Sequence, residues 1–279
     1  MNVETLSATL GARVRGIDLA APPDEATFEN ILTLFGKHRL LVFPDQSLDG
    51  VGQVGFSRRF GSLEGHVRHS FRDDALPDLH VVSNLDAQGL PTTAVRTTGN
   101  FHWHTDKSYM AIPSLATMLH ALQLPPSGGN TCFADMCAAF EALEPAQQQR
   151  LRPLRAIHSW EISRVKAGSP AATLDEIEAA PPVAHPLVRR HGPTGTEALY
   201  LGNHAAFIDG WDRHAGEALL AELLAHATKP QFVYEHAWKL GDFVMWDNRC
   251  LLHRANADFD LGVHPRVLNR TVVRGDASP

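Results

Sequence analysis

Two side chains that could bind a metal stand close together in the stretch Trp103-His104-Thr105-Asp106. If this stretch is a β-strand, His104 and Asp106 point to the same face, because side chains alternate between the two faces of a strand. An imidazole and a carboxylate would then project side by side, as two ligands of one metal should. The tripeptide His-x-Asp is common, so the alternative is a strand edge that carries two solvated polar residues.

A third ligand is needed, and the sequence offers His253. This histidine ends an apolar run that follows the turn Trp246-Asp247-Asn248-Arg249. Two histidines and one carboxylate form the facial triad of non-haem iron(II) oxygenases, which leaves three coordination positions open for a cosubstrate and dioxygen. A zinc site would more often be tetrahedral with one open position. The residues favour iron and leave a zinc-dependent hydrolase as an alternative.

Two arginines near the C-terminus could bind anions beside such a metal. Arg266 and Arg270 would share one face of a strand with residue 268. Guanidinium groups bind carboxylates through paired hydrogen bonds, which favours a pocket for two anionic ligands. The alternative is that both are ordinary surface arginines.

The segments around these residues predict a mainly β fold with flanking helices. Apolar spacing indicates helices from Asp24 to about Gly36 and at 48–60, 136–152 and 213–228. A strand pair is expected within 6–19. Short apolar runs predict further strands at 40–43, 79–82, 114–124, 183–191, 197–202, 231–238, 242–246 and 266–274. Helices that cluster early, followed by many short strands, favour two packed β-sheets with the helices outside.

Two long segments have the composition of lids over a site. Residues 84–101 are polar and rich in Gly and Thr, and residues 161–182 are rich in Ala, Pro and Glu. Loops of this length are usually functional or mobile. We expect both to belong to a single domain that spans residues 1–279, since a chain of this length can bury a large core.

Composition narrows the class of protein. The net charge of −6 argues against a general nucleic-acid binder. Cys132, Cys137 and Cys250 form no Cys-x-x-Cys pair, so we expect reduced, buried thiols. Neither a signal peptide nor an apolar run of membrane-spanning length is visible. We therefore expect a cytoplasmic protein without a membrane partner, and a homo-oligomer (a dimer or higher).

Taken in order, these motifs resemble the iron(II)- and 2-oxoglutarate-dependent dioxygenases of the taurine dioxygenase and phenoxyacetate-herbicide dioxygenase type. The similar pieces span most of the chain and comprise Gly16-Ile17-Asp18-Leu19, Phe56-Ser57-Arg58-Arg59-Phe60-Gly61, Trp103-His104-Thr105-Asp106, Pro126-Ser127-Gly128-Gly129-Asn130-Thr131, Trp246-Asp247-Asn248-Arg249 with His253, and Arg266 with Arg270. The resemblance implies a double-stranded β-helix, or jelly roll. It also implies Fe(II) bound by His104, Asp106 and His253, and 2-oxoglutarate bound by Thr131 and Arg266.

The resemblance further implies a small organic anion as substrate. Arg270, His66 and Asn100 fall where taurine dioxygenase contacts its substrate. His69 stands near the place of a substrate-binding tyrosine of that enzyme, and this departure counts against taurine itself. His66 and His69 could instead be exposed loop residues. Arg254, directly after His253, is more similar to the phenoxyacetate and phenoxypropionate enzymes.

These features favour hydroxylation of an aryloxyalkanoate-like carboxylate with cleavage of its ether bond, in a reaction that consumes dioxygen. A sulfonate or sulfate ester is the second choice of substrate. Related halogenases carry a small residue in place of the carboxylate ligand, so Asp106 favours hydroxylation over halogenation. A non-catalytic jelly-roll binding protein is the remaining alternative, and the intact triad argues against it.

Overall fold

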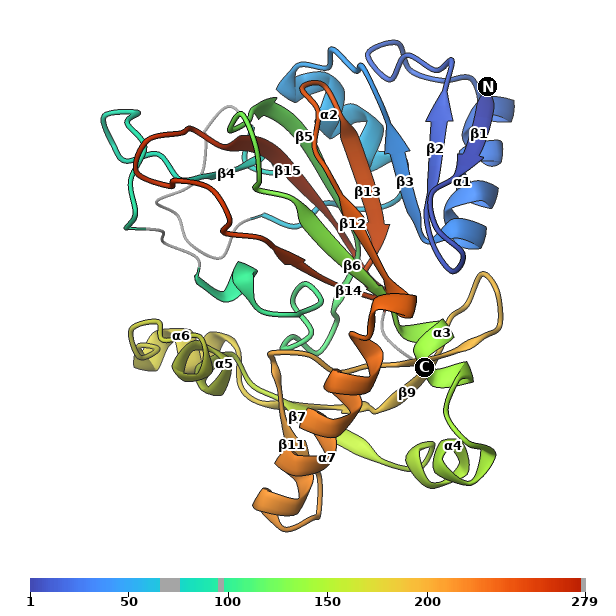
Figure 1. The fold of residues 1–279 in the computed structure, drawn as a ribbon, viewed down its shortest axis with the longest axis vertical. Coiled ribbons are helices and arrows are strands. Elements are labelled where there is room, and N and C mark those ends of the chain that lie inside the picture. The colour runs from blue at the N-terminus through green and yellow to red at the C-terminus, as the bar shows by residue number, and fades with distance from the viewer. Residues whose placement is uncertain (66–75, 95–97, 277–279) are drawn as a thin grey trace.

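Two facing β-sheets form the centre of the computed structural model, which describes residues 1–65, 76–94 and 98–276 (Figure 1). The larger sheet has the strand order β1 (Asn2–Thr5), β2 (Ala12–Arg15), β3 (Leu40–Phe43), β13 (Phe243–Asp247), β5 (Ser114–Gln123), β15 (Val267–Arg274) and β4 (His80–Ser83). The smaller sheet has the order β12 (Val233–His236), β6 (Thr131–Asp135) and β14 (Leu251–Ala255). Strands β2 and β3 run parallel, whereas β13 is antiparallel to both of its neighbours.

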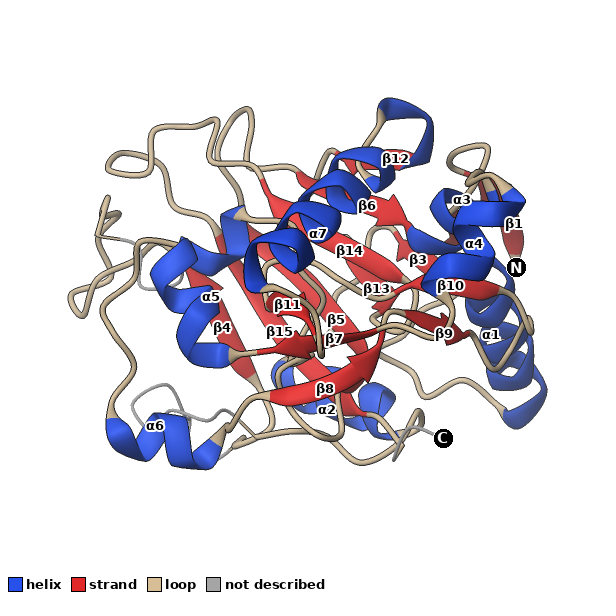
Figure 2. Ribbon diagram, turned by 90° about the horizontal axis from the view of Figure 1, so that it is seen from below, coloured by secondary structure: helices blue, strands red, loops and turns tan. Residues whose placement is uncertain are grey.

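The remaining elements surround this pair of sheets. The helices are α1 (Glu25–His38), α2 (Gly50–Arg58), α3 (Met136–Glu141), α4 (Pro145–Leu151), α5 (Trp160–Lys166), α6 (Leu174–Ala179) and α7 (Arg213–Ala227), with short 3-10 turns η2 (Thr98–Phe101) and η3 (Pro230–Phe232). Two small sheets pair β11 (Ala205–Ile208), β7 (Arg155–His158) and β8 (Val183–Pro186), and β10 (Glu197–Leu199) with β9 (Val188–Arg190). Figure 2 shows α7 lying across the sheets and α1 at one end. None of the helices in the described ranges is long and apolar enough to cross a membrane.

Alternating side chains of β13 join the two layers of the core. Trp246 belongs to the inner cluster and lies 5.3 Å, ring to ring, from Phe133 of β6. Phe243 faces the other way and lies 5.5 Å from Phe56 of α2. Because strand side chains alternate, β13 packs the smaller sheet on one face and α1 and α2 on the other. This arrangement confirms the expected mainly β, helix-flanked jelly roll.

Most of the expected elements are present, but several boundaries differ. The helix predicted at 136–152 is two helices, because Pro145 cannot continue α3 and begins α4 instead. Within 6–19 only Ala12–Arg15 forms a strand, and its antiparallel partner is β1 before that segment. Strands β1, β6, β7, β11 and β14 were not expected. All three cysteines are free and buried, as predicted.

The two candidate lids differ in structure. Residues 161–182 contain most of α5 and all of α6, which lie together on one side of the sheets (Figure 1). The segment 84–101 is fixed at its start, because the Asn84 amide donates to the carbonyl oxygens of Leu261 and His264 at 2.7 and 2.9 Å. Residues 95–97 lie outside the described part of the chain.

Candidate active site

His104, Asp106 and His253 meet in a buried cluster whose ligand atoms all lie within 4.8 Å of one another. The Nε2 atom of His104 is 3.9 Å from Asp106 Oδ1, and the Nε2 atom of His253 is 3.9 Å from Asp106 Oδ2. The three side chains are less than 10% exposed. The geometry thus brings together the three residues that the sequence singled out as candidate metal ligands.

The backbone that holds the cluster is not the predicted strand. His104 makes an isolated antiparallel bridge with His253, with N–O distances of 3.0 and 2.8 Å in the two directions. Asp106 lies beyond the bridge, where the chain turns. The two histidines are therefore neighbours across a bridge, with ring centres 4.1 Å apart, and Asp106 approaches them from the turn. The expectation that His104 and Asp106 share one face of a strand was wrong.

Asn248 and Thr117 fix the Asp106 carboxylate. The Thr117 hydroxyl donates to Asp106 Oδ2 at 2.5 Å and accepts from Asn248 Nδ2 at 2.9 Å. The Asn248 side-chain oxygen accepts from the Asp106 backbone N–H at 3.3 Å and from Trp246 Nε1 at 3.1 Å. Thr105 adds a hydroxyl hydrogen bond of 2.6 Å to the Asn248 carbonyl oxygen. The turn after β13 thereby positions the loop that carries the acid.

The two imidazoles suit a metal. His104 Nδ1 lies 2.8 Å from the carbonyl oxygen of His102, so this nitrogen carries the proton and leaves the Nε2 lone pair facing Asp106. Burial lowers the pKa of both His104 and His253, which keeps the rings neutral, as metal ligation requires. The His253 ring packs 4.6 Å from Trp246. Two neutral imidazoles and one carboxylate match the donor set of a facial iron site.

Arg270 pairs with the acid of this cluster. Its Nη2 atom lies 2.5 Å from Asp106 Oδ1. Burial opposes ionisation of Asp106, but the Arg270 guanidinium, with the Thr117 hydrogen bond, outweighs burial and holds the pKa of the carboxyl well below its usual range. Asp106 is therefore an anion and is available as a ligand.

Arg270 shares the inward face of β15 with Leu268 of the inner cluster and Val272 of the cavity wall, and Arg266 directly precedes this strand, which begins at Val267. Arg270 lines the cavity beside the triad, whereas Arg266 lines a smaller neighbouring cavity. Arg266 is only 8% exposed, so it is no surface arginine. Its pKa falls to about 10 because of burial.

The buried Arg266 guanidinium has room for an anionic ligand. Its Nε atom donates to the Gly129 carbonyl oxygen at 2.9 Å, and no carboxylate of the described chain forms an ion pair with it. Trp238 links Arg266 to Thr131. The Trp238 Nε1 atom donates to Thr131 Oγ1 at 3.0 Å, and the guanidinium lies 6.0 Å from the centre of the Trp238 ring. A buried cation with unused donors fits a carboxylate.

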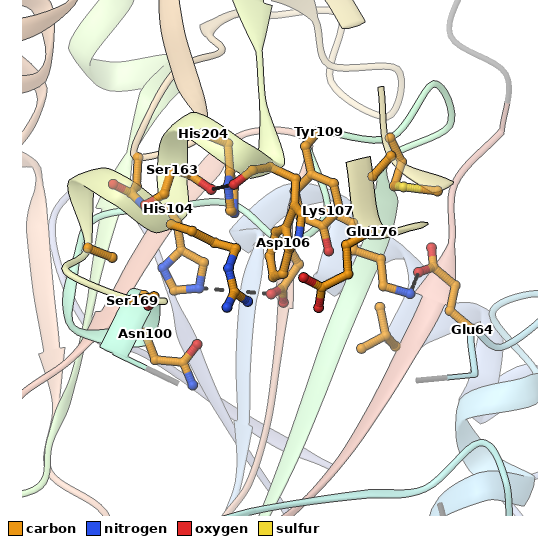
Figure 3. A pocket seen from close by; sticks show the side chains of 18 of the residues that line it. Glu64, Asn100, His104, Asp106, Lys107, Tyr109, Ser163, Ser169, Glu176 and His204 are labelled. Carbon is orange, nitrogen blue, oxygen red and sulfur yellow. Dashed lines mark hydrogen bonds and ion pairs between the residues drawn. The ribbon is translucent and has the colours of Figure 1, made fainter. Parts of the chain in front are cut away.

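A cavity of about 210 Å³ opens beside the triad (Figure 3). Tyr109, Trp160 and His204 form an aromatic wall, with the Tyr109 ring centre 4.7 Å from that of Trp160 and 4.8 Å from that of His204. Residues of α5 and α6 also line the cavity, so the predicted lid at 161–182 borders it. Asn100 borders both this cavity and the smaller one.

The sequence analysis missed several lining residues, among them Glu64, Lys107, Tyr109, Trp160 and His204. Lys107 and Tyr109 closely follow the His-x-Asp motif, which was the available signal. The other three come from distant segments, and nothing in the sequence links them to the motif. His66 and His69, the other expected substrate contacts, lie outside the described residues.

A second buried group of potential ligands comprises His191, Asp247 and Cys250. In this group the Asp247 carboxylate already has hydrogen-bond partners within the chain. Asp247 accepts from Arg249 Nε at 2.8 Å and Nη2 at 2.5 Å, and it lies 3.0 Å from His191 Nε2. These contacts stabilise the turn that leads from β13 to β14 and hence to His253.

Comparison with known proteins decides the family. A family model described as "Taurine catabolism dioxygenase TauD, TfdA family" matches residues 2–272. The chain belongs to this family. Membership in the TauD, TfdA family confirms the resemblance and makes the chain an enzyme that uses iron(II), 2-oxoglutarate and dioxygen.

Individual relatives extend over nearly the whole chain. An alpha-ketoglutarate-dependent 2,4-dichlorophenoxyacetate dioxygenase from Cupriavidus pinatubonensis is 40% identical over 281 residues, covering 98% of this chain and 97% of the relative. An (S)-phenoxypropionate/alpha-ketoglutarate-dioxygenase from Delftia acidovorans is 36% identical over 284 residues, covering 96% and 93%. The crystal structure of AAD-2 in complex with Mn(II) and N-oxalylglycine matches with a TM-score of 0.89 at 36% identity, covering 98% of both chains.

Proposed function

We propose that this TauD, TfdA family enzyme hydroxylates an aryloxyalkanoate and thereby cleaves its ether bond. The observation that carries the proposal is the composition of the cavity beside the triad, which offers an aromatic wall on one side and Arg270 on another. Such a cavity suits a ligand with a flat ring and a carboxylate. The relatives that act on 2,4-dichlorophenoxyacetate and on phenoxypropionate support the same class of substrate.

The proposal assigns a role to each candidate residue. His104, Asp106 and His253 would hold iron, and Thr131 and Arg266 would hold the distal carboxylate of 2-oxoglutarate. Arg270 and Asn100 would face the substrate, together with His66 and His69. When bound, iron and 2-oxoglutarate supply the oxidation that inserts one oxygen atom of dioxygen into a C–H bond and yields succinate and carbon dioxide.

The aromatic wall would hold the ring of the substrate. Burial lowers the pKa of His204 to about 3 and raises the pKa of Tyr109, so both side chains are uncharged near neutral pH. An uncharged wall buries an aryl ring without desolvating a charge. With the carboxylate at Arg270, the carbon between ring oxygen and carboxylate would lie beside the triad. The segments 84–101 and 161–182 would close over it and exclude water.

Hydroxylation at that carbon explains the loss of the ether bond. The product carries a hydroxyl and an aryloxy group on one carbon, and this hemiacetal collapses. An aryloxyacetate therefore yields a phenol and glyoxylate.

The test is a panel of anions scored by succinate release from 2-oxoglutarate under air, with iron(II) and ascorbate. The panel comprises aryloxyacetates, both enantiomers of aryloxypropionates, alkylsulfonates and sulfate esters. We expect the highest kcat/KM with an aryloxyalkanoate, accompanied by an equivalent amount of phenol. Faster turnover of a sulfonate or sulfate ester would overturn the proposal.

We further propose that the chain forms a homo-oligomer, folds as one domain and resides in the cytoplasm. Light scattering after size-exclusion chromatography tests the first statement, a single unfolding transition tests the second, and cell fractionation tests the third. A monomer, two separate transitions or a membrane-associated protein would contradict them in turn.

A further inference from the structure

Lys107 lines the wall of the substrate cavity together with two further cations, Arg164 and Arg270. It follows Asp106 directly, and both side chains line the same cavity (Figure 3). In an extended strand, consecutive side chains would point to opposite faces. Lys107 departs from this alternation because its backbone has a left-handed conformation, with φ at 50°. Residues with a Cβ rarely adopt this conformation, and those that do are enriched at functional sites.

Contacts of Lys107 and Ser108 fix the turn that carries the Lys107 side chain. The Lys107 carbonyl oxygen accepts from the Met110 N–H at 2.9 Å. The buried Ser108 hydroxyl lies 3.0 Å from Nδ1 of His158, which is fully buried. The base of the Lys107 side chain is therefore held in place before any substrate arrives.

Lys107 and Arg270 approach the same corner of the cavity. Arg270 of β15 lies opposite His80 of β4 in the sheet register. His80 Nε2 lies 3.2 Å from the Glu64 carbonyl oxygen, and the Glu64 carboxylate forms an ion pair with Lys107 (Figure 3). The pKa of His80 falls to about 4 because of burial, with further lowering by Arg270 and Lys107. The neutral His80 imidazole is thus close enough to both cations to be affected by their charge.

The acids that line the cavity all have partners. Asp106 pairs with Arg270, and Glu64 pairs with Lys107 and also accepts from the Ser114 hydroxyl at 3.3 Å. Glu176 accepts from the backbone N–H at the start of α6. An ammonium group has three N–H donors, and in the described part of the chain Lys107 uses them only toward Glu64. Donors remain for a ligand.

We propose that Lys107 and Arg270 together bind the carboxylate of the substrate, and that Lys107 thereby selects anionic substrates over neutral ones. The inference rests on the proposed function, since it takes the ligand to be an aryloxyalkanoate. A substrate carboxylate has two oxygens and can accept from both cations at once. Glu64 holds the ammonium in place without consuming all of its donors.

The test measures binding without turnover. The iron(II) and 2-oxoglutarate complex is titrated anaerobically with 2,4-dichlorophenoxyacetate and with its uncharged primary amide, and the change in visible absorption is followed. Lys107→Met should weaken binding of the carboxylate about 10- to 100-fold, the range for one charge-assisted hydrogen bond, and leave amide binding nearly unchanged. Lys107→Arg should restore the preference for the carboxylate. The exposed Lys37 provides the matched control, since Lys37→Met should change neither affinity.

Glu64→Gln separates a binding role from a structural one. It removes the partner of Lys107 and keeps the cation, so carboxylate binding should be retained or strengthened. If Glu64→Gln and Lys107→Met instead weaken both ligands equally, the pair only supports the cavity wall and the inference is overturned. Equal carboxylate affinity in Lys107→Met and the unsubstituted enzyme overturns it as well.

Succinate release under air distinguishes this inference from the proposed function. If the unsubstituted enzyme binds the carboxylate through Lys107 but releases no succinate with it, the proposed function fails and the binding role stands. If the enzyme releases succinate and phenol but Lys107→Met binds the carboxylate normally, the function stands and the inference fails. Binding of neither ligand overturns both.

Discussion

The Arg270 guanidinium lies 2.5 Å from Oδ1 of Asp106, so a cation of the protein already neutralises the acid of the candidate metal triad. A divalent metal at the triad would share that carboxylate with Arg270 and weaken the ion pair. Arg270 is then able to turn its donors toward an incoming anion. We therefore expect the ion pair to couple occupancy of the metal site to binding of the substrate.

Replacing Arg270 by Met should therefore affect binding of the substrate and binding of the metal differently. We expect the KM for the anionic substrate to rise about 10- to 100-fold, because a charge-assisted contact is lost. The affinity for Mn(II) should not fall, since Asp106 loses a competitor. Metal titration measures the affinity for Mn(II), and steady-state kinetics measures the KM for the substrate. Arg274→Met, at the exposed end of β15, is the control. A drop in metal affinity as large as the drop in kcat/KM would contradict this account.

Thr117 should matter for metal affinity although it is no ligand candidate. Its hydroxyl donates to Asp106 and accepts from Asn248, and Val would preserve its shape without these hydrogen bonds. We expect Thr117→Val to weaken iron(II) binding about 10- to 100-fold, as is typical for residues that orient a metal ligand. The exposed Thr33 provides the control, Thr33→Val. Unchanged metal affinity in a folded Thr117→Val variant would show that the carboxylate needs no such support.

Arg266 should determine how tightly the enzyme binds its cosubstrate, 2-oxoglutarate. Replacing Arg266 by Gln removes the cation near Thr131, so the enzyme should need a higher concentration of 2-oxoglutarate, with its KM raised about 10- to 100-fold. Arg266→Lys should give an intermediate value, because an ammonium keeps the charge but cannot form the paired hydrogen bonds of a guanidinium. The affinity for the aryloxyalkanoate should change little in either variant. A fully active Arg266→Gln enzyme would favour a hydrolase that needs no 2-oxoglutarate.

The metal requirement tests the alternative of a zinc enzyme. Removal of metal with a chelator should abolish succinate release, and iron(II) should restore it. Zinc(II) should occupy the triad and inhibit, because it has no redox chemistry. Activity that returns with zinc(II) but not with iron(II) would contradict the assignment of the donor set.

The sequence predicted the ligand types and the strands that bury them, because both depend on local features. The apolar run Leu40–Phe43 forms β3 as expected, and His104, Asp106 and His253 were chosen by residue type and spacing. The way these side chains meet was predicted wrongly. It depends on a backbone bridge between residues 104 and 253, which no local pattern reveals.

Other parts of the site depend on long-range packing as well. Arg266 and Arg270 line two different cavities, a difference that simple alternation along a strand does not reveal. Lys107 lines the cavity from a turn with a left-handed backbone, and Glu64 meets it from a distant segment. Pairings between segments distant in the sequence and unusual backbone angles are the features that periodicity does not encode.

Buried histidines should make the stability of the metal-free protein depend on pH. Burial lowers the pKa of fully buried His158 well below its usual value, with further lowering by His185 and His204, and burial also lowers the pKa of His80 to about 4. Below about pH 6.5 the unfolded chain binds protons at these positions and the folded chain does not. The free energy of unfolding should therefore fall with decreasing pH, by about 1.4 kcal/mol per pH unit for each such histidine.

Urea unfolding of the metal-free protein at pH 7.5, 6.5 and 5.5 measures this dependence. His158→Gln removes one titrating group, and the side-chain amide can still form a hydrogen bond with Ser108, the partner of His158 at 3.0 Å. Between pH 6.5 and 5.5 the free energy of unfolding of the variant should decline less than that of the unsubstituted protein, whatever the stability of the variant at pH 7.5. His214→Gln, at an exposed position, should show the same decline as the unsubstituted protein. Stability that stays constant or rises toward pH 5.5 would mean that the folded state accepts these protons, and that the histidines are not held neutral by burial.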